Sequence, residues 1–268
     1  RADSAVGGTH SYDILMLPAT TPYGVPPDAR QPYADPSNSN YHLSTNDGRW
    51  LGAMELSNGS VHLVSTTRDF STNRCGIYYG QIPNPWTPDS VYGQVIGHPS
   101  RDLGYPNVVA IGNEGCDEEL LIAFNHSSTT EKAGVSALYC ANDGSLSDFV
   151  TIKEGEGLVN KLSGPERWGD YFGLQTIYHD PQKVWAAGFY ALLNGGNSTW
   201  FGLLQSPDST ALHVDVTAEG MGCNQTLTAT VMGGIPPYTY TWNGLPGLST
   251  ESGICSGDTV ELYISDAR

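Results

Sequence analysis

Hydrophobic and polar residues alternate with a period of two in many short stretches of this chain, and turn residues separate the stretches. In the clearest case, residues 50–57 and 60–65 flank Asn58-Gly59. Asn-Gly between two alternating runs predicts a β-hairpin with a type I′ turn, because both central residues of that turn need a positive φ. Helical periodicity is convincing nowhere, so we expect an all-β protein. Further strands are expected at residues 12–17, 76–81, 107–111, 120–124, 135–139, 149–152, 172–178, 184–190 and 199–204.

A polar stretch at residues 205–210 divides the chain. Beyond it, strands are expected at residues 211–217, 226–232, 237–242 and 259–264, with turns at 233–234, 243–244 and 256–258. This is the size and rhythm of a small β-sandwich. We therefore expect one domain over residues 1–205 and a second over residues 206–268.

Residues 20–46 do not continue the alternating pattern. They contain several prolines and a cluster of Ser and Asn. Each proline removes a backbone donor, so this segment cannot sustain a strand ladder. We expect a long surface loop.

Composition and charge exclude some classes of partner. The chain has 268 residues, with 12 Lys and Arg against 28 Asp and Glu, and a formal net charge of −16. Such a charge repels nucleic-acid phosphates and anionic membrane surfaces. No window approaches the roughly 18 apolar residues that a membrane-spanning helix needs. We expect neither nucleic-acid binding nor membrane insertion, and the start at Arg1 is expected to reflect processing or excerption from a longer chain.

Five cysteines show no Cys-x-x-Cys pair and no histidine at zinc-finger spacing, which disfavours a structural metal site. Disulfides in an oxidising compartment are the alternative use of such residues. The first choice of pair is Cys223 with Cys255, which would staple the small sandwich. Cys116 with Cys140 is the second choice, and it leaves Cys75 as a thiol. All five could instead be reduced and buried.

Two acidic segments are calcium candidates. Asp35 opens a stretch with oxygen-bearing side chains at alternate positions, but Asn40 and Asn46 stand where an EF-hand needs Gly and Glu. The run Asp117-Glu118-Glu119 could hold Ca²⁺ through carboxylate oxygens. Solvated turns are the favoured interpretation of both, so no cofactor is expected and calcium is the alternative.

The C-terminal part resembles a known surface module. Residues 233–244, Gly-Gly-Ile-Pro-Pro-Tyr-Thr-Tyr-Thr-Trp-Asn-Gly, with the Cys223 and Cys255 segments around them, are similar to the SprB-type repeat. That repeat is an Ig-like module of gliding adhesins and other surface proteins of Bacteroidetes-type bacteria. The resemblance implies a sandwich, here cut at its last strand. Tyr238, Tyr240 and Trp242 lie on one strand face and are expected to fill the core rather than stack on a ligand.

The upstream part resembles secreted β-propellers related to sialidase/BNR-type repeats. Residues 164–175 and 180–188 carry this similarity, and residues 46–50 and 142–149 are degenerate relatives of the Asp-box turn. The number of expected strands before residue 205 corresponds to about three four-stranded blades, whereas closed propellers typically need about four to eight blades. We expect residues 1–205 to be the C-terminal blades of a longer domain. A different β architecture is the alternative.

Four tripeptides of the Asp-(Ser/Thr)-x kind resemble the O-glycan acceptor motif of the same bacteria. Their acceptor hydroxyls belong to Ser4, Ser90, Ser209 and Thr259. These residues are expected to be glycosylated on an exported protein.

The sequence lacks the motifs of several common enzyme classes. Gly-x-Ser-x-Gly, His-Glu-x-x-His and phosphate-binding Gly loops are all absent from the sequence. Glycoside hydrolysis remains open, because it needs only two carboxylates about 5 to 10 Å apart. Glu166, Asp170 and Tyr171 could then be catalytic, with Arg167 and Trp168 binding the sugar. The favoured alternative is structural, with Arg167 and Asp170 in a buried ion pair and Trp168 in the core.

The combined interpretation is a non-catalytic segment of a large extracellular cell-surface protein, acting in adhesion or as a stalk. Its expected partners are surface polysaccharide or other cell-surface proteins, and the bacterial export machinery. The rival is an exported glycoside hydrolase in which the propeller is catalytic and the Ig-like module is a spacer. A third possibility is a secreted protein whose C-terminal module precedes a sorting domain.

Overall fold

The structure is a computed structural model that describes residues 14–33, 35, 37–112, 118–141, 144–205, 212–232 and 237–265. The chain forms two compact units, Arg1–Leu204 and Gln205–Arg268. Apart from one short 3-10 turn, η1 (Ser39–Tyr41), every regular element of the described residues is a strand. The expected all-β class is therefore confirmed.

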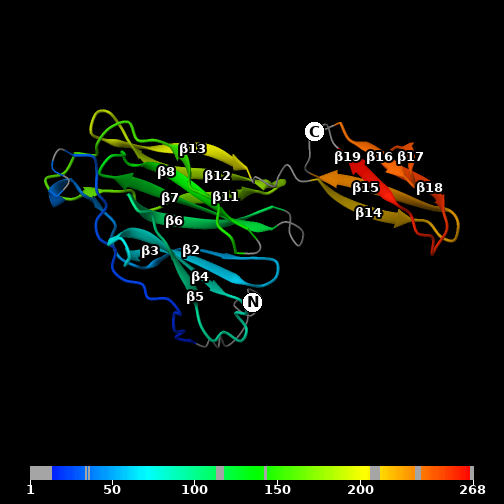
Figure 1. Cartoon of the computed structure of the whole chain (residues 1–268), viewed down its shortest axis with the longest axis horizontal. Coiled ribbons are helices and arrows are strands. Elements are labelled where there is room, and N and C mark those ends of the chain that lie inside the picture. Colours follow the sequence, from blue (N-terminus) through cyan, green and yellow to red (C-terminus); the bar gives the residue numbers. More distant parts are fainter. Residues whose placement is uncertain are drawn as a thin grey trace, which may run out of the picture. The chain divides into compact units, whose positions relative to one another are not determined.

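Three sheets lie as successive layers in the larger unit (Figure 1), and in each sheet the strands neighbour one another in chain order. The first sheet contains β2 (Trp50–Glu55), β3 (Val61–Asp69), β4 (Arg74–Ile82) and β5 (Tyr92–Ile96). The second contains β6 (Arg101–Ile111), β7 (Glu119–Ser128), β8 (Gly134–Cys140) and β9 (Val150–Lys153). The third contains β11 (Gly173–Ile177), β12 (Asp180–Ala191) and β13 (Asn197–Gln205).

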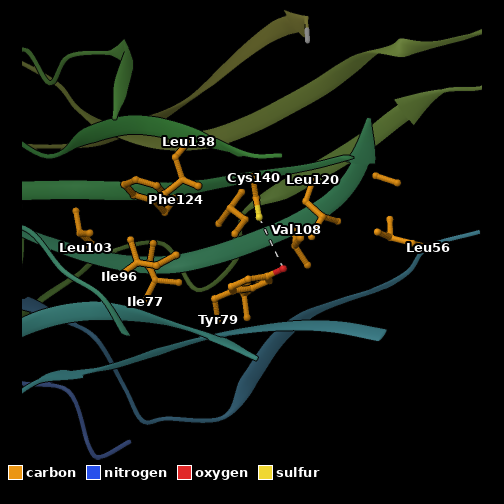
Figure 2. Close-up of a cluster of buried hydrophobic side chains, with 13 residues drawn as sticks. Leu56, Ile77, Tyr79, Ile96, Leu103, Val108, Leu120, Phe124, Leu138 and Cys140 are labelled. Atoms are coloured by element: carbon orange, nitrogen blue, oxygen red, sulfur yellow. Dashed lines mark hydrogen bonds between the residues drawn. The ribbon is translucent and has the colours of Figure 1, made fainter. Parts of the chain in front are cut away.

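The middle sheet is covered on both faces, and every residue of β7 and β8 is buried. One apolar cluster joins it to the first sheet through residues such as Ile77, Phe124 and Leu138 (Figure 2). A second cluster joins it to the third sheet through residues such as Ala123 and Val184. Burial on both faces explains why these central strands read as continuous apolar runs, because neither face meets water.

A predicted hairpin and a predicted turn both form, and the two turns differ in type. Between β2 and β3, Gly59 N donates to Leu56 O at 2.8 Å, and only Gly59 of this loop has a positive φ, 82°. The loop has three residues and a glycine bulge, so the predicted type I′ turn is wrong here. Asn243-Gly244 does form a type I′ turn, with φ of 48° and 78°, between β16 (Thr239–Trp242) and β17 (Leu245–Gly247).

The segment 20–46 is irregular, as expected, but it is not confined to the surface. Its short strand β1 (Leu43–Ser44) pairs in parallel with β10 (Glu166–Arg167). Ala29 and Leu43 are fully buried in a third cluster that also contains Trp168. The loop therefore supplies part of the core. The strand expected at residues 12–17 is not seen in residues 14–17, which have no regular structure; the rest of it lies outside the described residues.

The smaller unit has two three-stranded sheets. β14 (His213–Glu219), β15 (Gln225–Met232) and β18 (Thr250–Ile254) form one, and β17, β16 and β19 (Leu262–Ser265) form the other. The Cys223–Cys255 disulfide is present, as predicted. Trp242 is 3% exposed, and its indole Nε1 donates to Leu248 O at 2.9 Å, so this aromatic residue belongs to the core.

Candidate functional site

The predicted carboxylate pair does not face a common space. Glu166 is 1% exposed, and its Oε1 accepts hydrogen bonds from the backbone N–H groups of Lys161 and Leu162, both at 2.8 Å. Asp170 instead forms an ion pair with Arg167. One carboxylate therefore fixes a loop and the other holds a guanidinium, and neither arrangement is that of a free acid.

The remaining residues of this motif divide between core and surface. Trp168 is fully buried, and its ring meets the Tyr105 ring edge-on with centroids 6.1 Å apart. It has no accessible surface with which to contact a ligand. Tyr171 is 85% exposed. The Arg167–Asp170 pair forms, but the expectation that it is buried is wrong, because the Arg167 side chain is 64% exposed.

Two of the calcium candidates accept hydrogen bonds from backbone N–H groups, Asp35 within a local turn and Glu118 from a distant loop. Asp35 Oδ1 accepts from Ser37 N at 3.1 Å, and Glu118 Oε2 accepts from Ser57 N at 2.7 Å. Glu119 is buried, and Asp117 lies outside the described residues. Within the described part of the chain, no three His, Cys, Asp or Glu side chains converge into a group that could hold a metal ion.

Other predicted sites are only partly described. Thr259 is exposed and Ser90 is partly buried, and both lie outside the strands. Ser4 and Ser209 lie outside the described residues. Cys75 is a buried thiol. Cys116 also lies outside the described residues, so its pairing with Cys140 stays a prediction.

The outer face of the β11–β13 sheet is the strongest candidate surface. Trp185 is 47% exposed on β12, where it alternates with the buried Val184 and Ala186, and Phe201 is 69% exposed on β13. Between them lies a shallow hollow of about 390 Å³ whose lining carries no charged side chain. The hollow is lined by Gly173, Leu174, Gln175, Trp185, Ala186, Ala187 and Phe201.

Register explains how these residues meet. Gln175 on β11 pairs with Trp185 on β12, and Gly173 pairs with Ala187, so an amide and a ring lie beside two residues with little or no side chain. Side chains directly opposite each other on one face are close neighbours. The small residues form the floor of the hollow, and the aromatic residues and the amide rise around it.

The sequence predicted the strands of this surface but not the surface itself. One signal was present: residues 200–204, Trp-Phe-Gly-Leu-Leu, are apolar on both faces of β13. A strand with one wet face normally shows polar residues on that side. Trp200 and Leu204 pack against the middle sheet, which leaves Phe201 and the 45%-exposed Leu203 on the outer face.

A buried chain of polar groups crosses the interface of the first two sheets, and the sequence did not predict it. Ser60 Oγ donates to Asn58 Oδ1 at 2.7 Å, so Ser60 must accept from His62 Nε2–H at 2.8 Å. His62 Nδ1 then accepts from the Tyr79 hydroxyl at 2.7 Å, and the Cys140 thiol donates to that hydroxyl at 3.8 Å (Figure 2). All bonds run in one direction, with a neutral imidazole at the centre.

We expect the buried imidazoles of His62 and His126 to make the larger unit acid-labile. Burial lowers the pKa of each to about 4, from 6.5 in the unfolded chain. The unfolded state therefore binds more protons below pH 6.5, so the free energy of unfolding falls as the pH drops from 6.5 towards 4. Urea denaturation at pH 7.5, 6.5, 5.5 and 4.5 measures this effect. NMR titrations that give His62 and His126 a pKa near 6.5 in the folded protein would contradict this prediction.

A polar hollow of about 620 Å³ lies near the start of β6. Two of its charged groups pair with each other: Arg101 binds Glu131 through two bonds of 2.8 and 2.6 Å. His98 Nδ1 accepts from Arg101 N at 3.0 Å. Arg101 and Glu131 in this open hollow are therefore already paired with each other.

Comparison with known proteins identifies no relative: no protein-family model, no curated protein and no solved structure matches this chain. Among the described residues, no helix has the length and apolar character needed to cross a membrane.

Proposed function

We propose that the larger unit is a non-catalytic binding domain of an extracellular cell-surface protein, and that it adheres to uncharged polysaccharide through the outer face of its β11–β13 sheet. The observation that carries this proposal is the pairing of two exposed aromatic rings, Trp185 and Phe201, with the Gln175 amide around an uncharged hollow. Exposed apolar patches with a few polar groups are typical of binding sites.

The chemistry of the face fits sugar rings. Pyranose rings have apolar faces of axial C–H groups, which pack on aromatic side chains, and an amide can donate to and accept from sugar hydroxyls. The chain carries a formal charge of −16, which repels acidic polymers. A neutral polysaccharide is therefore the class of ligand that this surface favours.

Separate observations support the proposed location and architecture. The Cys223–Cys255 disulfide fits an oxidising, extracellular compartment. Three sheets stacked in chain order resemble successive blades of a propeller, and the smaller unit resembles an Ig-like module. This arrangement supports the interpretation of a binding head followed by a spacer module.

The rival interpretation as a glycoside hydrolase loses its main support in the Glu166 motif. Both carboxylates of the candidate pair are engaged, Glu166 with backbone amides and Asp170 with Arg167. A hydrolase needs one free general acid and one free base or nucleophile. Within the part of the chain that the structure describes, we find no other arrangement that favours catalysis over binding.

Co-sedimentation with insoluble cellulose, chitin and starch tests the proposal. We expect the protein to be retained on at least one of them, and Trp185→Ala to weaken retention about tenfold, equivalent to about 1.4 kcal/mol of lost stacking. Trp86→Ala is the matched control, because Trp86 is 86% exposed between β4 and β5 and lies away from the face. Retention on none of the three polymers, or equal loss in both variants, would refute the proposal.

A further inference from the structure

The edges of the two sheets in the smaller unit differ in how well they are protected. An exposed edge strand offers unpaired N–H and C=O groups, and proteins blunt such edges with bulges, prolines, Lys residues or very short strands. The β18 edge has a register shift opposite Gln225 and a glycine, Gly253, at a φ of 82°. The β17 edge has three residues, one of them Pro246, and β19 has four residues.

β14 has none of these devices. Its seven residues pair with β15 one by one, from His213 to Glu219, without a register shift. The strand contains no Pro, Gly or Lys. It is the outermost strand of its sheet, and residues 214–219 are all exposed, including Val214 at 39% and Val216 at 48%. A long, straight edge with exposed β-branched residues is a template for another strand.

We propose that β14 pairs edge to edge and antiparallel with β14 of a second copy of this chain, about a two-fold axis at Val216. This interaction is independent of polysaccharide binding by the other unit. In this register Val216 lies opposite Val216 of the second copy, and Val214 opposite its Ala218. The two three-stranded sheets would become one continuous six-stranded sheet.

The pattern of charged and apolar side chains along β14 favours a second copy of the chain as the partner strand. The two-fold register places Asp215 opposite Thr217 of the other copy, so like charges do not lie directly opposite each other at these positions. It also places apolar side chains opposite apolar side chains on one face and polar side chains opposite polar ones on the other. An isologous contact requires this kind of self-complementarity.

The pairing is expected to be weak and sensitive to salt. One strand pair buries less surface than a standard protein interface, so we expect a dissociation constant on the order of 10–100 µM. Each copy carries a formal charge of −16, and salt screens the resulting repulsion. Sedimentation velocity should therefore show more dimer at high salt than at low salt.

Engineered cysteines test the register in the whole chain, in a Cys116→Ser background that leaves the buried Cys75 and Cys140 unchanged. Directly opposite residues have Cβ atoms about 5 Å apart, close enough for oxidation to a disulfide, whereas diagonal pairs are about 7–8 Å apart. Val216→Cys should thus form a covalent dimer on its own. Asp215→Cys and Thr217→Cys should link only when the two variants are mixed.

Leu245→Cys is the control, because Leu245 is 71% exposed on the short β17 edge. A Val216→Cys yield equal to that of Leu245→Cys, or linking of Asp215→Cys to itself, would overturn the proposed pairing. A second measurement avoids cysteine chemistry: Val216→Lys places two ammonium groups opposite each other and should remove the dimer while the far-UV CD spectrum is retained. A wild-type chain that stays monomeric at about 200 µM in high salt also contradicts the proposal.

Discussion

Replacing Trp168 with alanine is expected to destabilise the larger unit by about 4 kcal/mol, within the range for large aromatic residues in cores. Trp168 is fully buried, and the backbone of Gly104 approaches its ring so closely that a Cβ at that position would lie 2.7 Å from it. The ring packs among residues of distant segments, including Leu43 and Ala191. Loss of the ring leaves a cavity where these segments meet. Urea denaturation followed by far-UV CD measures the change.

Tyr171→Ala is the matched control for this experiment. Tyr171 lies three residues further along the chain and is 85% exposed, so its truncation should change stability by no more than about 0.5 kcal/mol. If instead Trp168→Ala left stability unchanged and abolished binding of a sugar, Trp168 would be a ligand-binding residue and its burial in the core would be wrong.

Reduction of the Cys223–Cys255 disulfide is expected to unfold the smaller unit and leave the larger one folded. The bond closes a loop with a sequence separation of 32, for which the chain-entropy relation gives about 3–4 kcal/mol. Few side chains of this unit are fully buried: among its described residues, only Ala229 and Trp242 belong to the buried apolar set. A core of this size contributes little stability to the unit without the disulfide. Hydrogen exchange measured by mass spectrometry, with and without dithiothreitol, resolves the two units.

The double variant Cys223→Ala/Cys255→Ala should reproduce the effect without reductant. The larger unit provides an internal control, because Cys75 and Cys140 are retained in it at buried positions. Protection of residues 213–254 that survives both treatments would show that the small sandwich folds without its cross-link.

Sequence patterns predicted most strands of both units but not β1, β5, β10, β17 and β18, and two of these omissions have clear physical reasons. β5 was not predicted, since Gly93 interrupts its alternation; a side chain at that position would collide with the Tyr78 ring, so glycine is required there by the packing. β17 was not predicted because Leu-Pro-Gly reads as a turn. Proline is tolerated in an edge strand, where its missing donor costs no ladder bond.

Functional surfaces were harder to predict than strands because they depend on register between strands. His62 and Tyr79 are 17 residues apart and come together through the pairing of β3 with β4, in which Val64 lies opposite Tyr79. The Gln175–Trp185 pair likewise depends on how β11 aligns with β12. The Glu166–Tyr171 motif resembled a site because its charged and aromatic residues are adjacent in sequence. Adjacency in sequence does not show that the side chains of Glu166 and Trp168 are buried.

The parallel pairing of β1 with β10 affects the order in which the chain can fold. Leu43 pairs with Glu166, and Gln31 bonds to the backbone of Val159 at 2.8 Å. A chain that emerges from a ribosome or an export channel N-terminus first must therefore hold Gln31 and Leu43 without these two partners until about 120 further residues have followed. Contacts of such high sequence separation slow folding. This early proline-rich segment has low strand propensity of its own, which lowers the risk that it associates with neighbouring chains during the delay.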